Sequence, residues 1–163
     1  MPQLLLMRHG KAAQNDKIAD RDRPLTARGR RDSEAIGRAL ANDFRPDRVL
    51  CSPALRTKET LAALLSAIGA IADVALVDDL YDHPGDYTDV VAADGQRSQR
   101  LLLIGHNPAI QDTAVNLIGA GDGAVRGRLH EKFPTSAVAV IAFDGEWQAI
   151  EPLSGRLIAF LTP

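Results

Sequence analysis

The sequence is poor in several features that define specialised classes of protein. It has one cysteine, Cys51, among 163 residues, which excludes an internal disulfide and a cysteine-rich zinc site. Aromatic residues make up only 4% of the chain, too few for a surface on which nucleic-acid bases would stack. No apolar run approaches the length of a transmembrane helix, and the one near the N-terminus is too short for the core of a signal peptide. We therefore expect a cytoplasmic protein without a membrane or nucleic-acid partner.

The charge and length of the chain are those of an ordinary globular domain. The formal net charge is −2 and the isoelectric point is near 6.1, so no extended basic surface is expected. Hydrophobic residues make up 45% and charged residues 25% of the sequence, which is typical of a folded protein. We expect residues 1–163 to form a single domain with a substantial core. The composition gives no indication of the number of subunits.

Strands and helices are expected to alternate along most of the chain. Short apolar runs predict buried strands over residues 4–7, 49–51, 74–77 and 101–104. Cap residues and apolar spacing predict a helix after the N-cap Thr26, a second with Ser52 as N-cap and Pro53 as its first residue, and a third that Asn107-Pro108 opens in the same way. A shorter helix is expected over 86–93. In the first of these helices, Ala35, Ile36, Ala39, Leu40 and Phe44 are expected to form the buried face.

The last third of the chain is expected to be less regular. The glycine-rich stretch 119–133 predicts an irregular segment. Residues 137–143 and 147–150 flank Asp144-Gly145, which predicts a β-hairpin with a tight turn, and a last strand is expected over 157–161. Together these elements predict an α/β fold, a three-layer αβα sandwich whose mostly parallel sheet is made mixed by the hairpin.

The first predicted strand ends in an unusual way. Leu4 to Met7 is followed directly by Arg8, His9 and Gly10, two side chains that can carry positive charge and a residue that permits a sharp turn. In open α/β sheets, ligands lie outside the carboxyl ends of the strands, which is where these side chains would stand. On this stretch alone, a surface arginine and a hydrogen-bonded polar histidine are an equally good interpretation.

Two further strand ends carry polar groups of the same kind. Ser52 and Arg56 follow the second predicted strand, and His106 with Asn107 follows the strand over 101–104. If these strands are parallel, two arginines, two histidines and two helix N-termini meet at one edge of the sheet without a carboxylate. Arginine makes bidentate contacts to phosphate oxygens, so the set predicts a phosphoryl site. Two histidines without a third ligand are weak evidence for zinc, and no metal or cofactor is expected.

Histidine at such a site can act as a nucleophile. A neutral imidazole nitrogen can attack phosphorus to form a phosphohistidine, which water then hydrolyses. The arginines and the second histidine would stabilise the charge on the equatorial oxygens during both steps.

Three motifs in this order resemble the histidine phosphatase superfamily, the phosphoglycerate-mutase-like enzymes. They are Arg8-His9-Gly10, Ser52-Pro53-x-x-Arg56 and Gly105-His106-Asn107-Pro108. Arg23-Pro24-Leu25-Thr26-x-x-Gly29 and Leu80-Tyr81-Asp82 look like secondary signatures of the same family. The short chain, with little inserted after the third strand, is most similar to the small bacterial phosphohistidine phosphatases of the SixA type.

The resemblance implies a role for each matching residue. His9 would be the phosphorylated nucleophile, and Arg8, Arg56 and His106 would hold the phosphoryl group. Asn15 would lie near the phosphate, where the mutase branch often has an asparagine. Ser52 and Asn107, at the strand ends, are further candidate substrate-binding residues. Asp82 matches the position of the general acid in the mutase branch, whereas SixA-type enzymes lack a firm acid there. Asp82 is therefore either an acid or a solvated turn residue.

Two other motifs point to different chemistry and fit less well. Cys51 to Arg56 resembles the loop of cysteine phosphatases, but four residues intervene where that loop has five, so Cys51 is more simply explained as a small core residue. Residues 119–124 fit G-x-G-x-x-A but follow a helix rather than a strand, which is the wrong context for dinucleotide binding. His83 and His130 are expected on surface loops.

Three functions remain open. The leading hypothesis is a metal-independent phosphatase that acts through phosphohistidine at His9 on a phosphorylated partner, most simply a phosphohistidine-bearing protein. Small phosphomonoesters are the alternative substrates, for a phosphatase or a mutase, and a firm acid at Asp82 would favour them. The third is a phosphate-binding module without catalysis, for which the arginines alone would suffice.

Overall fold

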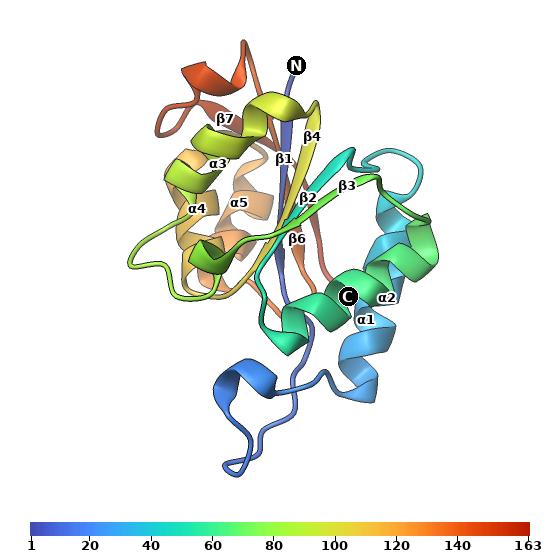
Figure 1. The fold of residues 1–163 in the computed structure, drawn as a ribbon. Coiled ribbons are helices and arrows are strands. Elements are labelled where there is room, and N and C mark those ends of the chain that lie inside the picture. Colours follow the sequence, from blue (N-terminus) through green and yellow to red (C-terminus); the bar gives the residue numbers. More distant parts are fainter.

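The computed structural model describes residues 1–163, in which a single seven-stranded sheet forms the centre. The strand order is β3-β2-β4-β1-β6-β7-β5, and β6 alone runs against the others (Figure 1). The strands are β1 (Gln3–Arg8), β2 (Arg48–Cys51), β3 (Asp73–Leu76), β4 (Arg100–Gly105), β5 (Ile118–Gly121), β6 (Val138–Phe143) and β7 (Gly155–Leu161). This confirms the predicted α/β fold with a mixed, mostly parallel sheet.

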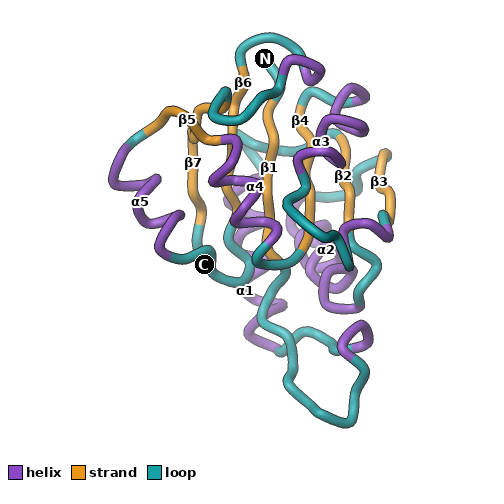
Figure 2. The backbone as a smooth tube through the Cα atoms, turned by 90° about the vertical axis from the view of Figure 1, so that its left-hand side faces the viewer, coloured by secondary structure: helices purple, strands orange, loops and turns teal.

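Helices cover both faces of the sheet, which makes three layers (Figures 1 and 2). The helices are α1 (Ala27–Leu40), α2 (Leu55–Ile68), α3 (Thr88–Asp94), α4 (Ala109–Leu117) and α5 (Gly123–Glu131), with short 3-10 turns at Asp20–Asp22, Asp78–Leu80, Gly95–Arg97 and Trp147–Ala149. The first two helices pack on one face over a core that includes Leu5 and Met7. The other three cover the opposite face, where the core includes Leu4 and Leu6. Alternate residues of β1 thus serve both cores.

Helix α1 begins where the sequence predicts, but its buried face differs. The Thr26 hydroxyl accepts a hydrogen bond of 3.0 Å from the Gly29 amide, as an N-cap does. Ile36 is buried as predicted, whereas Ala35 is exposed, and so is Ala39. Gly37 is buried instead of these alanines. Helix α2 packs so closely against it that a Cβ on Gly37 would lie 2.9 Å from the Leu64 carbonyl oxygen. Helix α1 therefore packs closely against α2 at Gly37, and Ala35 and Ala39 face solvent.

The stretch 119–133 is regular, contrary to the sequence prediction. Ile118 to Gly121 form edge strand β5, paired with β7, and α5 follows at once. The Asp122 carboxylate accepts hydrogen bonds from the Ala124 and Val125 amides, which caps α5. His130, expected on a loop, is an exposed residue of α5. Gly119 permits close packing, since a Cβ there would lie 1.9 Å from the Leu153 carbonyl oxygen, whereas Gly123 and Gly127 in α5 have open space around them.

The hairpin predicted around Asp144-Gly145 is also wrong. β6 pairs with β7, and the residues Trp147–Ala149 between them form a 3-10 turn rather than a strand. The Trp147 side chain is buried, and its indole Nε1 donates a hydrogen bond of 2.6 Å to the Ser98 carbonyl oxygen. This anchor pulls the segment away from the sheet, so the next strand to pair with β6 comes from further along the chain.

The carboxyl ends of three central strands lie level with one another. β4 is parallel to both of its neighbours, with Arg8 of β1 opposite Gly105 and Cys51 of β2 opposite Ile104. The motif residues that follow these strands are therefore brought to one edge. The loop over residues 11–24 extends beyond that edge, at the bottom of Figures 1 and 2. None of the helices combines the length and apolar character needed to span a bilayer.

Candidate active site

A polar cavity of about 260 Å³ opens at this edge of the sheet. It brings together five of the residues predicted for the site: Arg8, His9, Arg56, His106 and Asn107. Five further residues complete its lining: Lys11, Ala12, Gln14, Arg23 and Thr135. The lining contains four arginine or lysine side chains and two histidines but no carboxylate. A cavity with this lining favours a small dianion with oxygen acceptors on every side.

His9 is held in one tautomer by its own main chain. Its Nδ1 lies 2.7 Å from the Gly10 carbonyl oxygen, and because a carbonyl only accepts, Nδ1 carries the proton. Nε2 is then left with a lone pair and no hydrogen-bond partner in the protein. Burial and, to a smaller extent, the charges of His106, Arg56 and Arg8 outweigh the opposing Gly10 hydrogen bond and lower the pKa of His9 to about 3. At neutral pH the ring is uncharged and nucleophilic.

Gly10 itself is fixed by close packing against α1. Its amide donates a hydrogen bond of 2.9 Å to the Thr60 hydroxyl. A Cβ at this position would lie 2.9 Å from the Gly29 carbonyl oxygen and from the Ser33 hydroxyl. The glycine therefore lets the chain after β1 approach α1 closely, which sets the position of the carbonyl that holds His9.

His106 faces His9 across the cavity, with ring centroids 5.3 Å apart. Its Nε2 lies 2.8 Å from the Ser52 hydroxyl, and its Nδ1 accepts from Arg56 Nη2 at 3.3 Å. Because Nδ1 accepts from Arg56, the neutral ring carries its proton on Nε2, which donates to the Ser52 hydroxyl. Burial, followed by the positive charge of Arg56, lowers the pKa of His106 to about 4. Ser52 thus orients the His106 ring through this hydrogen bond and does not itself line the cavity.

The engagement of Ser52 explains why α2 starts later than predicted. The expected N-cap was Ser52, with Pro53 as the first helical residue, but the helix begins at Leu55. The Ser52 hydroxyl is committed to His106, and its contact to the Ala54 amide is long, at 3.5 Å. α4 likewise begins at Ala109, one residue after the Asn107-Pro108 pair. Arg56 consequently stands in the first turn of α2, where it reaches the cavity.

The two predicted arginines are both partly committed to main-chain oxygens. Arg8 Nη1 donates to the Phe133 carbonyl at 2.9 Å, and Arg56 Nη1 donates to the Asp20 carbonyl at 2.6 Å. Burial lowers the pKa of Arg8, although a guanidinium stays charged at any working pH. The Nε of each arginine is buried without a partner. Buried donors without partners are costly, so these two atoms are natural contacts for a bound anion.

Asp20, which the sequence did not single out, contacts several residues of the site. Its Oδ2 accepts from Arg56 Nη2 at 3.1 Å and from the Tyr81 hydroxyl at 2.8 Å, and its Oδ1 accepts from Arg23 Nε at 3.1 Å. Tyr81 in turn stands edge-on to His106, with ring centroids 5.7 Å apart. The only sequence signal for this group was the pair of secondary signatures that contain Arg23 and Tyr81. Nothing in the spacing marks Asp20, because it reaches the site from an exposed loop.

Tyr87 is a second residue that sequence reasoning missed. Its side chain is buried. Its hydroxyl accepts a hydrogen bond of 3.2 Å from the His106 amide and donates one of 2.8 Å to the Leu80 carbonyl oxygen. A Cβ on Gly105 would lie 2.7 Å from its ring. Tyr87 therefore packs directly under the turn that carries His106, and only glycine fits before that histidine.

Besides Ser52, two predicted site residues lie outside the cavity. The Asn15 side chain accepts from the Lys17 amide at 2.9 Å and lines a separate cavity of about 380 Å³ within the 11–24 loop. Asp82 is exposed and lines an adjoining cavity of about 200 Å³ that shares His106 and Asn107 with the first. Asp82 is thus next to the site, whereas Asn15 stabilises its own loop.

Cys51 is buried in the core beneath α1 and α2 and does not line the cavity. Burial raises the pKa of its thiol to about 12, so the sulfur stays protonated and is a poor nucleophile. Nowhere in the protein, the cavity included, are three His, Cys, Asp or Glu side chains grouped so that they could hold a metal ion.

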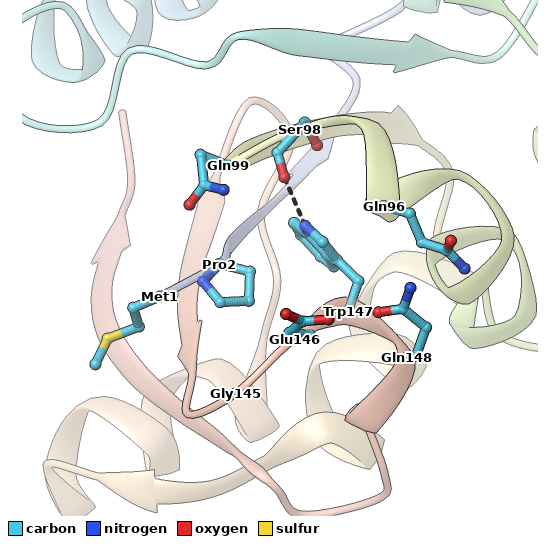
Figure 3. Close-up of a pocket in the computed structure, with 9 residues that line it drawn as sticks. All are labelled: Met1, Pro2, Gln96, Ser98, Gln99, Gly145, Glu146, Trp147 and Gln148. Carbon is cyan, nitrogen blue, oxygen red and sulfur yellow. Dashed lines mark hydrogen bonds between the residues drawn. The ribbon is translucent and has the colours of Figure 1, made fainter.

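A larger cavity, of about 370 Å³, lies at the opposite, amino end of β1 and β4 (Figure 3). It is bordered by Met1 and Pro2 and by the segment around Trp147, whose indole is turned inward to Ser98. Glu146 is its only charged side chain, and it contains no histidine or arginine. It lacks the groups that would recognise a phosphoryl dianion or react with one.

Comparisons with known proteins agree with this arrangement. The family model of the histidine phosphatase superfamily (branch 1) matches residues 4–131. An uncharacterized protein of Mycobacterium tuberculosis (strain ATCC 25618 / H37Rv) is 40% identical over 161 residues, which are 96% of this chain and 99% of the relative. A structure from Nakamurella multipartitia, described as a candidate phosphohistidine phosphatase SixA, matches with a TM-score of 0.85 and 30% identity over 99% of this chain and 96% of its own. The protein histidine phosphatase SixA complexed with tungstate matches with a TM-score of 0.78 and 25% identity over 99% and 97% of the two chains.

Proposed function

The chain belongs to branch 1 of the histidine phosphatase superfamily, and on that premise we propose that it is a phosphatase whose nucleophile is His9. The observation that carries the proposal is the state of that ring. Its Nδ1 proton is bound to the Gly10 carbonyl, and its unprotonated Nε2 belongs to a cavity lined by Arg8 and Arg56 without a carboxylate. A binding module would need the arginines but not an uncharged histidine between them.

In the first step, the Nε2 lone pair of His9 attacks phosphorus, and the bond from phosphorus to the leaving atom breaks. The leaving atom takes the bonding pair. The phosphorylated ring keeps its Nδ1 proton and becomes cationic, and the Gly10 carbonyl stabilises that charge. The guanidinium groups of Arg8 and Arg56 stabilise the charge on the equatorial oxygens.

In the second step, water attacks phosphorus from the side that the leaving group has vacated. The P–N bond breaks, the electron pair returns to Nε2, and the proton lost by water leaves with phosphate or solvent. His9 departs as a neutral imidazole, a good leaving group that needs no proton donor. The product is inorganic phosphate and the starting form of the enzyme.

The preferred substrate is a protein phosphohistidine. A phosphoimidazole that is protonated on its second nitrogen leaves as a neutral ring, whereas an alkyl ester leaves as an alkoxide and needs a general acid. Asp82 is the candidate for such an acid, and it is an exposed residue of the adjoining cavity rather than of the phosphoryl cavity. The similarity to SixA, which was solved with the tetrahedral oxyanion tungstate, supports the same choice.

The proposed phosphatase domain takes in the whole chain. The family model ends at residue 131, but β6 and β7 lie beyond it and complete the same sheet. Thr135 of that last part lines the cavity, and the Phe133 carbonyl holds Arg8. Residues 132–163 are therefore needed for the site as well as for the core.

The experiment that tests this function is a turnover assay with and without EDTA. The substrates are a phosphohistidine-bearing protein and a panel of small phosphomonoesters. We expect release of phosphate from the protein substrate at the same rate in chelator, because the cavity supplies arginines where a metal would otherwise neutralise the phosphoryl charge. Turnover of the esters alone would reassign the substrate class, and binding of phosphate without turnover of any substrate would leave a binding module.

A further inference from the structure

The guanidinium of Arg56 is hydrogen-bonded to Asp20, an acidic residue that lies outside the cavity. Both of its terminal nitrogens contact Asp20, Nη1 the main-chain oxygen at 2.6 Å and Nη2 the carboxylate at 3.1 Å. Asp20 does not line the phosphoryl cavity but borders the neighbouring one within the 11–24 loop. The arginine is buried, at 5% exposure, whereas Asp20 is exposed. The one carboxylate that touches this phosphoryl-binding residue thus comes from a surface loop.

We propose that Asp20 is a counter-ion of Arg56 that weakens the binding of phosphate in the cavity and thereby speeds product release. The inference rests on the proposed function, because it assigns to Arg56 the role of holding the phosphoryl group. The Asp20 carboxylate occupies Nη2 of Arg56, so a phosphate dianion that binds this guanidinium competes with it for that nitrogen, and the two negative charges repel each other. Both effects lower the affinity for phosphate without removing the arginine.

The surroundings of Asp20 keep it charged and in place. The hydrogen bond from Tyr81, together with those from Arg56 and Arg23, lowers the pKa of Asp20 to about 2. Tyr81 is held in turn by the Arg21 guanidinium, which lies 5.2 Å from its ring centroid. A carboxyl group in this setting has no proton to give at working pH, so a role as general acid is a poor fit.

A purely positioning role for Asp20 makes the opposite prediction to a counter-ion. If the carboxylate only held Arg56 in place, its removal would loosen the guanidinium and weaken phosphate binding. If it acts as a competing charge, its removal tightens phosphate binding. The sign of the change in affinity therefore separates the two roles.

The test is calorimetric titration of the full chain with inorganic phosphate at low ionic strength. Asp20→Asn keeps the main-chain contact and an oxygen acceptor but removes the charge. We expect it to bind phosphate roughly fivefold more tightly than the unmodified protein, and the difference should shrink in 0.5 M salt. In turnover, kcat should fall and inhibition by phosphate should strengthen, because product release becomes slower.

Asp22→Asn is the matched control, since it removes the same charge from the same exposed 3-10 turn, where Asp22 has no contact with Arg56. It should change phosphate affinity by less than twofold. Unchanged or weaker phosphate binding by Asp20→Asn, with its thermal midpoint retained, would overturn the counter-ion role. If that variant unfolds, Asp20→Ser is tested in the same way and the same sign applies. Absence of phosphate binding in the unmodified protein would instead reject the proposed function.

Discussion

The Gly10 carbonyl oxygen accepts the Nδ1 proton of His9 at 2.7 Å, so two consecutive residues fix which ring nitrogen is free to react. Burial keeps the imidazole uncharged among cationic side chains, and the contact with Gly10 fixes the nitrogen that carries its single proton. Several consequences of this arrangement can be measured.

Substitution His9→Ala should abolish turnover and leave phosphate binding largely intact. The covalent step needs the Nε2 lone pair, whereas binding depends mainly on the arginines. We expect a loss in kcat of at least about 10³-fold with a change in phosphate Kd of less than about threefold. Rapid quenching of the unmodified enzyme during turnover should trap acid-labile, base-stable phosphate on His9. Near-normal turnover by His9→Ala would contradict the mechanism.

Substitution Arg56→Ala should weaken phosphate binding as well as turnover. It removes charged hydrogen bonds worth about 1.5–3 kcal/mol, so the phosphate Kd should rise on the order of 10- to 100-fold in titration calorimetry. Arg38→Ala serves as the control, because Arg38 is an exposed residue of α1 that does not line the cavity. Equal phosphate affinities for the two variants would show that Arg56 does not hold the phosphoryl group.

Substitution Cys51→Ala should leave kcat within about twofold of the unmodified enzyme. The thiol is buried in the core, and its pKa of about 12 keeps it protonated. The folded enzyme should likewise resist inactivation by iodoacetamide, which alkylates accessible thiolates. Phosphate trapped on Cys51, or loss of activity with a folded Cys51→Ala protein, would place the chemistry on the sulfur instead.

The free energy of unfolding should fall as the pH is lowered from 7 to 4.5 in phosphate-free buffer. In the unfolded chain histidines titrate near 6.5, but in the folded protein the pKa of His9 is about 3 and that of His106 about 4. Between these values the unfolded state binds more protons, so stability is fully present above pH 6.5 and declines below it.

Urea titration of His9→Gln should give a flatter curve over this range, by on the order of 1–2 kcal/mol, because one such group is gone. His130→Gln, at an exposed position of α5, should follow the unmodified protein. Identical pH curves for His9→Gln and the unmodified protein would mean that His9 is not held neutral by the fold.

The parts of the site that could be predicted share one property: each lies at the end of a buried strand or in the first turn of the helix that follows one. Arg8, His9 and His106 are fixed by the strand ends, and Arg56 by the first turn of the next helix. Because a parallel sheet brings its carboxyl ends to one edge, local sequence was enough to place these four residues together. Asp82, which the resemblance to the mutase branch points to, borders the cavity next to the site, and its role as an acid remains a prediction.

Residues that reach the site from loops could not be placed in this way. Asp20 contacts Arg56 from 36 positions away in the chain, and its approach depends on how the 11–24 loop lies across the edge. Asn15, in the same loop, accepts a hydrogen bond from the Lys17 amide and lines a neighbouring cavity, and its contact with substrate remains a prediction. A loop has no periodicity from which the direction of its side chains can be read.

The amino-acid sequence by itself determined the family, the α/β sheet and the four residues around the phosphoryl cavity, because apolar runs of strand length and the residues that end them are local features. Tertiary structure alone decided the path of the last third of the chain, where β6 pairs with β7 past the buried Trp147. It also decided the electrostatics of the site. The neutral state of His9, the orientation of His106 by Ser52 and the pairing of Arg56 with Asp20 all depend on burial and on contacts between distant segments, which no local pattern records.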